Sequence, residues 1–167
     1  MKKLSIISIG VVITIVILGV YGGSTYFQND DSELVIKTGW YGGFCFGYCT
    51  GDIEITSEKI VFHSKAQRVP KESSCSEVYE EIPFTKQEFQ SLIKLVDLDK
   101  FYELPDVVSS HANVDGSDSW IEISNEDKTK KIIFVNPDDV PEIKKFAIKL
   151  MHLRTDLSSQ YLASCFD

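Results

Sequence analysis

The chain opens with a long segment that carries no charge, and this segment limits what the rest can fold into. After Lys2 and Lys3, residues 4–27 contain no charged side chain and are dominated at first by Ile, Val and Leu. A membrane-spanning helix needs about 20 mostly apolar residues, whereas the apolar core of a cleaved signal peptide has about 7–15. We therefore expect residues 1–27 to form a transmembrane signal-anchor helix that contacts the membrane through residues 4–27.

Charges on either side of this segment predict its orientation. The two lysines precede it, Asp30 and Asp31 follow it, and positively charged flanks remain in the cytoplasm. The sequence thus predicts a single-pass protein of the cell membrane, with residues 28–33 as an acidic stalk and residues 34–167 as an extracytoplasmic globular domain. Small residues near Gly22–Ser24 would also permit cleavage, so secretion after signal removal is the alternative.

The expected domain is strongly acidic. All 25 Asp and Glu follow the apolar segment, together with 15 of the 17 Lys and Arg, so the stalk and the domain together carry about ten net negative charges. Such a surface disfavours nucleic acid and anionic lipid headgroups as partners, because both carry negative charge. Basic proteins and cations stay open as partners. The domain has about 140 residues, which is enough for one ordinary hydrophobic core.

Alternation of polar and apolar residues predicts a sheet. Asp52, Glu54 and Thr56 alternate with Ile53 and Ile55, which is the period of two expected from a strand with one buried face. Short runs rich in β-branched and aromatic residues, bounded by turn residues, indicate the remaining strands. These are expected at residues 34–37, 59–63, 78–82, 120–124 and 130–135.

The start of one helix is clearly marked. Thr85 and Glu88 have the spacing of a capping box, in which the threonine oxygen accepts a backbone N–H three residues on and the glutamate reaches back. Phe84 and Phe89 have the spacing of a hydrophobic staple. The apolar face expected for this helix repeats at helical spacing and consists of Phe89, Leu92, Ile93 and Val96.

A second helix is expected near the end of the chain. Residues 136–139 would open it, because carboxylates in a first turn interact favourably with the helix dipole. Neighbouring antiparallel strands without regular βαβ alternation indicate an α+β fold, with an N-terminal transmembrane helix followed by a mainly antiparallel sheet and two helices packed on one face. The buried face of the last helix would consist of Ile143, Phe146, Ala147 and Leu150.

Four cysteines occur in the part of the chain that is expected outside the cytoplasm, where disulfides form and persist. They are Cys45, Cys49, Cys75 and Cys165, and sequence alone does not choose among their three pairings. We favour Cys45 with Cys49, because neighbouring glycines allow a tight turn, and Cys75 with Cys165. A zinc site of four thiolates and a redox-active pair are alternatives, although paired zinc spacings and a C-x-x-C motif are missing from the sequence.

The cysteine cluster also carries a resemblance. The segment from Cys45 to Thr50, Cys-Phe-Gly-Tyr-Cys-Thr, resembles the C-x-G-x-C-P motif of an uncharacterised bacterial family known only as a domain of unknown function, with Thr50 in place of the proline. As in that family, the motif is followed by a strand, a turn and another strand, and the resemblance covers about residues 40–155. It implies no activity, cofactor or partner.

A further motif involves acidic residues. Asn113, Asp115, Gly116 and Glu122 have the spacing of a twelve-residue calcium loop, and Ca²⁺ prefers six to eight oxygen ligands. A histidine in the first position and a strand after the loop depart from the pattern, and an Asp-Gly turn leading into a strand is the alternative interpretation. The candidate cation ligands are His111, Asn113, Asp115, Asp118 and Glu122.

These patterns lead to three functional hypotheses. The first is a non-catalytic binding or interaction module that binds an envelope or secreted protein; no catalytic residue and no cofactor is predicted, and the oligomeric state is left open. The second is a metal-dependent enzyme or cation-binding protein that uses residues 111–122. The third is a thiol redox protein that uses Cys45 and Cys49. His63 and His152 are interpreted as solvated or hydrogen-bonded side chains without a catalytic role.

Overall fold

The structure, a computed structural model, describes residues 34–42, 45–69, 75–111 and 116–162. The predicted signal-anchor helix, residues 1–27, and the predicted stalk, residues 28–33, lie outside the described residues. Among the helices that are described, none is long and apolar enough to cross a membrane.

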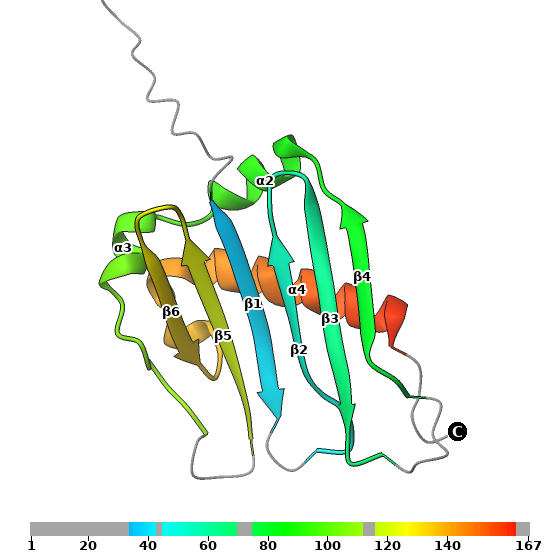
Figure 1. Ribbon diagram of the computed structural model, residues 1–167. Helices are drawn as coiled ribbons and strands as arrows, with labels where there is room; N and C mark the ends of the chain where they lie inside the picture. The colour runs from blue at the N-terminus through cyan, green and yellow to red at the C-terminus, as the bar shows by residue number, and fades with distance from the viewer. Residues whose placement is uncertain (1–33, 43–44, 70–74, 112–115, 163–167) are drawn as a thin grey trace, which may run out of the picture. The chain divides into compact units, whose positions relative to one another are not determined.

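One antiparallel sheet organises the described part of the chain (Figure 1). Its six strands follow one another in the order β4-β3-β2-β1-β5-β6, and all five neighbouring pairs are antiparallel. The first strand therefore lies in the middle, with a three-stranded meander on one side and a hairpin on the other. The strands are β1 (Val35–Gly42), β2 (Gly47–Ile55), β3 (Lys59–Gln67), β4 (Val78–Pro83), β5 (Ser117–Ser124) and β6 (Thr129–Phe134).

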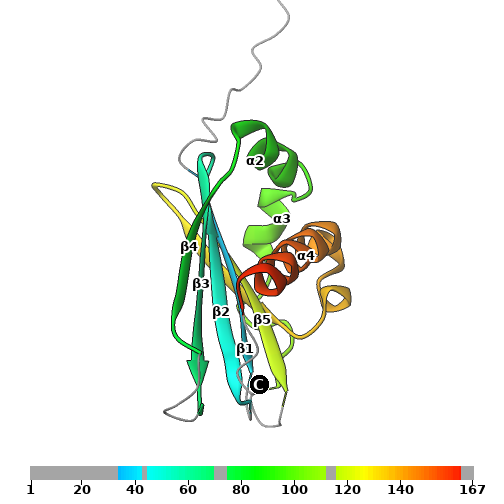
Figure 2. The ribbon, with the colours of Figure 1, turned by 90° about the vertical axis from the view of Figure 1, so that its right-hand side faces the viewer.

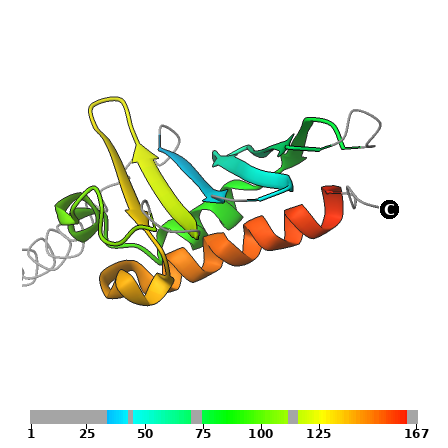
Figure 3. The same cartoon turned by 90° about the horizontal axis from the view of Figure 1, so that it is seen from below.

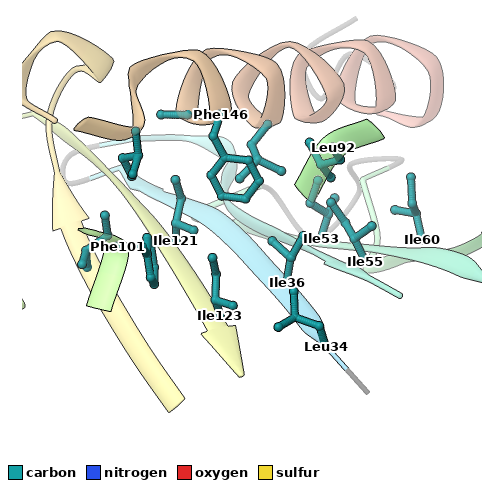
Figure 4. Packing of buried hydrophobic residues seen from close by; sticks show 14 of the residues in the cluster. Leu34, Ile36, Ile53, Ile55, Ile60, Leu92, Phe101, Ile121, Ile123 and Phe146 are labelled. Atoms are coloured by element: carbon teal, nitrogen blue, oxygen red, sulfur yellow. The ribbon is translucent and has the colours of Figure 1, made fainter. Parts of the chain in front are cut away.

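The described helices all lie on one face of this sheet (Figure 2). The described α-helices are α2 (Lys86–Ile93), α3 (Leu98–Glu103) and α4 (Lys144–Tyr161). The predicted α+β class is confirmed, with one α-helix more than the sequence predicted. The isoleucines of the central strands face these helices; Ile36 of β1, for example, lies beside Ile55 of β2 and Ile123 of β5 (Figure 4). Each such side chain contributes roughly 1.5–3 kcal/mol by leaving water.

The start of α2 agrees with the prediction. Thr85 Oγ1 accepts the backbone N–H of Glu88 at 3.2 Å, and Glu88 Oε2 accepts the N–H of Thr85 at 2.8 Å. Phe89 is fully buried and Phe84 packs against the same core. The helix ends at Ile93, so the predicted apolar face extends past its end.

Helix α3 was not predicted. Asp97 caps it, because its Oδ1 accepts the N–H of Lys100 at 3.3 Å. The helix has six residues, and a helix of that length shows less than two turns of periodicity. Its one fully buried side chain is Phe101, which lies in the core shown in Figure 4.

The last helix begins later than predicted. Two short 3₁₀ helices, Pro137–Asp139 and Pro141–Ile143, come before α4. Pro141 has no N–H to donate to a carbonyl four residues earlier, so a continuous α-helix cannot start at residue 136. The buried face is confirmed, since Ile143, Phe146, Ala147 and Leu150 are at most 2% exposed.

Two tryptophans cover glycines on neighbouring strands. Trp40 of β1 pairs with Gly51 of β2, and Gly39 of β1 pairs with Trp120 of β5. A Cβ atom on Gly51 would lie 2.1 Å from the ring of Trp40, and a Cβ atom on Gly39 would lie 2.6 Å from the ring of Trp120. Since Gly39 and Trp40 are adjacent in one strand, the two rings lie on opposite faces of the sheet.

We expect Gly51→Ala to lower the free energy of unfolding by about 1–3 kcal/mol, because the added methyl group meets the ring of Trp40. Chemical denaturation of the purified chain measures this change. Gly42→Ala is the matched comparison and should cost less, since its Cβ would lie 3.3 Å from the nearest atom. In the background Trp40→Leu, Gly51→Ala should cost much less; equal costs in both backgrounds would contradict the assignment of the clash.

Candidate functional site

A pocket of about 450 Å³ lies between the second half of α4 and one end of the sheet. Figure 3 shows α4 running across that face of the strands. The end of β1 and the beginnings of β2 and β5 supply Trp40, Tyr48 and Ser117, because antiparallel neighbours bring these ends together. The helix side consists of Arg154, Thr155, Ser158, Ser159 and Leu162.

Among the described residues that line this pocket, Arg154 is the one that carries a charge. Its Nη1 donates to the carbonyl oxygen of Gly39 at 2.6 Å, and its Nη2 donates to Ser119 Oγ at 3.3 Å. Its guanidinium carbon lies 5.1 Å from the centre of the Trp40 ring, within the range of a cation–π contact. Arg154 is thus half-buried and held against β1 and β5.

No carboxylate among the described residues forms an ion pair with Arg154. Burial lowers the pKa of Arg154 to about 10, so the side chain still carries its charge at neutral pH. A partly desolvated cation without a carboxylate is unfavourable, and an anion that reaches it is bound by charge-assisted hydrogen bonds worth about 1.5–3 kcal/mol each. A guanidinium has five N–H donors, and the contacts described above use two of them.

The sequence contains a signal for this site in the spacing of residues along α4. Leu150, Arg154, Leu157 and Tyr161 follow one another at spacings of four, three and four, so they lie on one face of α4. Leu150 and Leu157 are buried, and the ring of Tyr161 lies against that of Phe62 in the core. The presence of Arg154 on this otherwise apolar face of the helix is the sequence feature that indicates the site.

A disulfide adjoins the pocket. Cys45 and Cys49 are bonded to each other, with their Cα atoms 5.5 Å apart, which confirms the predicted pair. Gly47 within this small ring has φ 90°, a conformation that favours glycine. Cys75 is also in a disulfide. Cys165 lies outside the described residues, so its pairing with Cys75 stays a prediction.

The predicted cation loop is described only in part, since Asn113 and Asp115 lie outside the described residues. Asp118 Oδ1 accepts the N–H of His111 at 2.7 Å, and its Oδ2 accepts the hydroxyl of Ser110 at 2.6 Å. Burial raises the pKa of Asp118, but these hydrogen bonds outweigh it and hold the pKa below its ordinary value.

Glu122, the last predicted cation ligand, lies within β5 and pairs with Lys37 and Lys131 of the neighbouring strands. Among the residues that the structure describes, no group of three or more His, Cys, Asp or Glu side chains is placed to hold a metal ion. The described candidates therefore serve in loop and sheet contacts, and the cation site as a whole stays a prediction.

No model of a protein family matches the chain, and no curated protein matches it either. The resemblance to a bacterial domain of unknown function therefore stays a prediction. The fold and the site define an α+β domain with a pocket between its sheet and its last helix.

We expect the double variant Cys45→Ser, Cys49→Ser to lose about 2 kcal/mol of unfolding free energy, because the closed loop is short. Denaturation of the oxidised chain and the variant gives the difference. Peptide mapping without reduction should recover Cys45 linked to Cys49. Free thiols at both positions in chain prepared from an oxidising compartment would contradict the bond.

Proposed function

We propose that this chain is a membrane-anchored extracytoplasmic binding domain without catalytic activity, which holds its ligand by an anionic group at Arg154. The observation that carries the proposal is a half-buried guanidinium that lines a pocket of about 450 Å³ and has no carboxylate partner among the described residues. An acidic side chain or the terminal carboxylate of an envelope or secreted protein would supply the anionic group.

The polar groups that line the pocket support the binding of an anion there. Ser117, Ser158 and Ser159 line the same pocket as Arg154, and their hydroxyl groups can donate hydrogen bonds to an anion bound there. Ser119 and the carbonyl of Gly39 hold the guanidinium in place, so little side-chain entropy is lost when a ligand binds. Residues 28–167 carry about ten net negative charges and repel anions at long range, so the contacts within the pocket must select the anion.

Trp40 provides a direct signal for binding, because its ring lies beside Arg154. The full-length chain in non-ionic detergent, with Trp120→Phe to leave Trp40 as the single tryptophan, is titrated with sodium sulfate against sodium chloride at equal ionic strength. We expect a saturable change in Trp40 fluorescence with sulfate. Arg154→Gln should weaken sulfate binding at least tenfold, which corresponds to about 1.4 kcal/mol.

Lys149→Gln is the matched control. Lys149 lies on the exposed side of α4, and its substitution removes the same charge from the same helix without touching the pocket. This variant should bind sulfate as the parent does. Equal weakening by both substitutions would point to net charge rather than to the pocket, and a parent chain that shows no saturable response would contradict the proposed function.

A further inference from the structure

The outer face of the sheet carries a histidine held between two carboxylates. His63 of β3 places its Nε2 2.7 Å from Glu77 Oε1 and its Nδ1 3.3 Å from Asp52 Oδ1. A neutral imidazole has one N–H, so only the protonated ring donates to both carboxylates. Since Asp52 belongs to β2 and Glu77 precedes β4, the charged ring ties a connecting segment to the sheet.

That segment also contacts the pocket. Tyr48 lines the pocket of Arg154, and its hydroxyl donates to the carbonyl oxygen of Ser76 at 3.0 Å. Ser76 and Glu77 lie between Cys75, which is in a disulfide, and Val78, which begins β4. Within this short stretch, Tyr48 contacts Ser76 and His63 contacts Glu77.

We propose that His63 is a proton-operated clasp: its charged form holds Ser76 and Glu77 against the sheet and keeps Tyr48 in the pocket wall, and deprotonation weakens this hold because the neutral ring has lost its charge and keeps only one of its two N–H donors. The effect on ligand binding rests on the function proposed above. The clasp itself does not, because it consists of contacts that exist without a ligand.

The charges around His63 favour the closed form in acid. Hydrogen bonding to Glu77, and next to Asp52, raises the pKa of His63 above its ordinary value of 6.5, against the opposing effect of burial. Hydrogen bonding to His63 holds the pKa of Glu77 below its ordinary value of 4.5. The titratable groups that face the pair are Asp52 and Glu54 of β2, Lys59 and Lys65 of β3, and Tyr79 of β4.

The direction of the pH dependence follows from these shifts. Because the pKa of His63 is raised, its protonated ring stabilises the contact fully below pH 6.5, the ordinary value. This stabilisation is lost as the pH rises through the raised pKa. Because the pKa of Glu77 is lowered, its carboxylate stabilises the contact above pH 4.5, the ordinary value. This stabilisation is lost as the pH falls through the lowered pKa. The clasp is therefore closed between the lowered pKa of Glu77 and the raised pKa of His63, and it weakens as the pH rises through the latter.

The first test uses the ligand-free chain. Nuclear magnetic resonance of the full-length protein in detergent follows the ring signals of His63 and Tyr48 between pH 5.5 and 8.5. We expect the Tyr48 signals to shift with the same midpoint as the His63 ring. The shift should vanish in His63→Gln and persist in His152→Gln, a control that makes the same substitution at an exposed position on α4. Tyr48 signals that stay constant while His63 titrates would overturn the proposal.

The second test measures sulfate affinity with the Trp40 signal at pH 5.5 and 8.5. Arg154 keeps its charge over this range, because its pKa is about 10. We expect the affinity to fall at least threefold at pH 8.5 in the parent and to be independent of pH in His63→Gln. A Tyr48 shift without a change in affinity would overturn the link to the pocket. If sulfate does not bind at either pH, the proposed function fails, and the pH dependence of the Tyr48 signals in the ligand-free chain still decides whether the clasp exists.

Discussion

The contact between Trp40 and Gly51 supports much of the described structure. Because Gly51 has no side chain, the indole ring can lie against β2 on the face that the helices cover. The guanidinium of Arg154 lies over that ring and bonds to the carbonyl of Gly39 and the hydroxyl of Ser119. One side chain of α4 thus joins β1, β5 and the helix, and the end of the sheet opens into a pocket rather than closing into apolar core.

The two faces of the sheet differ in whether their charged side chains have partners of opposite charge. On the outer face Lys37 lies between Glu54 and Glu122 of the neighbouring strands, and its Nζ is 2.9 Å from Glu54 Oε2. Hydrogen bonding to Glu54 raises the pKa of Lys37, against the opposing effect of burial. Such exposed pairs contribute little stability, about 0–1 kcal/mol each, but their two charges offset each other. On the inner face Arg154 has no such partner among the described residues, and this contrast is why the pocket is the candidate site.

The features around the pocket come from segments far apart in the sequence. The ring closed by Cys45 and Cys49 contains Tyr48, which reaches Ser76 in the connection between β3 and β4. His63 holds the next residue, Glu77, from the outer face. The connection is therefore fastened from both faces of the sheet, so a change of protonation on one face can reach a pocket on the other without a change in the fold.

The sequence by itself determined the local structure. Alternation around Ile53 and Ile55 predicted a strand, Thr85 with Glu88 predicted a helix start, and glycine between two cysteines predicted a tight disulfide; each depends on neighbours in the chain. The tertiary structure decided what depends on distant contacts: the central position of β1, the burial of Phe101 that supports the short α3, the placement of Arg154 over Trp40, and the pairing of His63 with Glu77. These could not be predicted because the order of strands and the face that α4 covers result from burying one common apolar surface, which no single segment encodes.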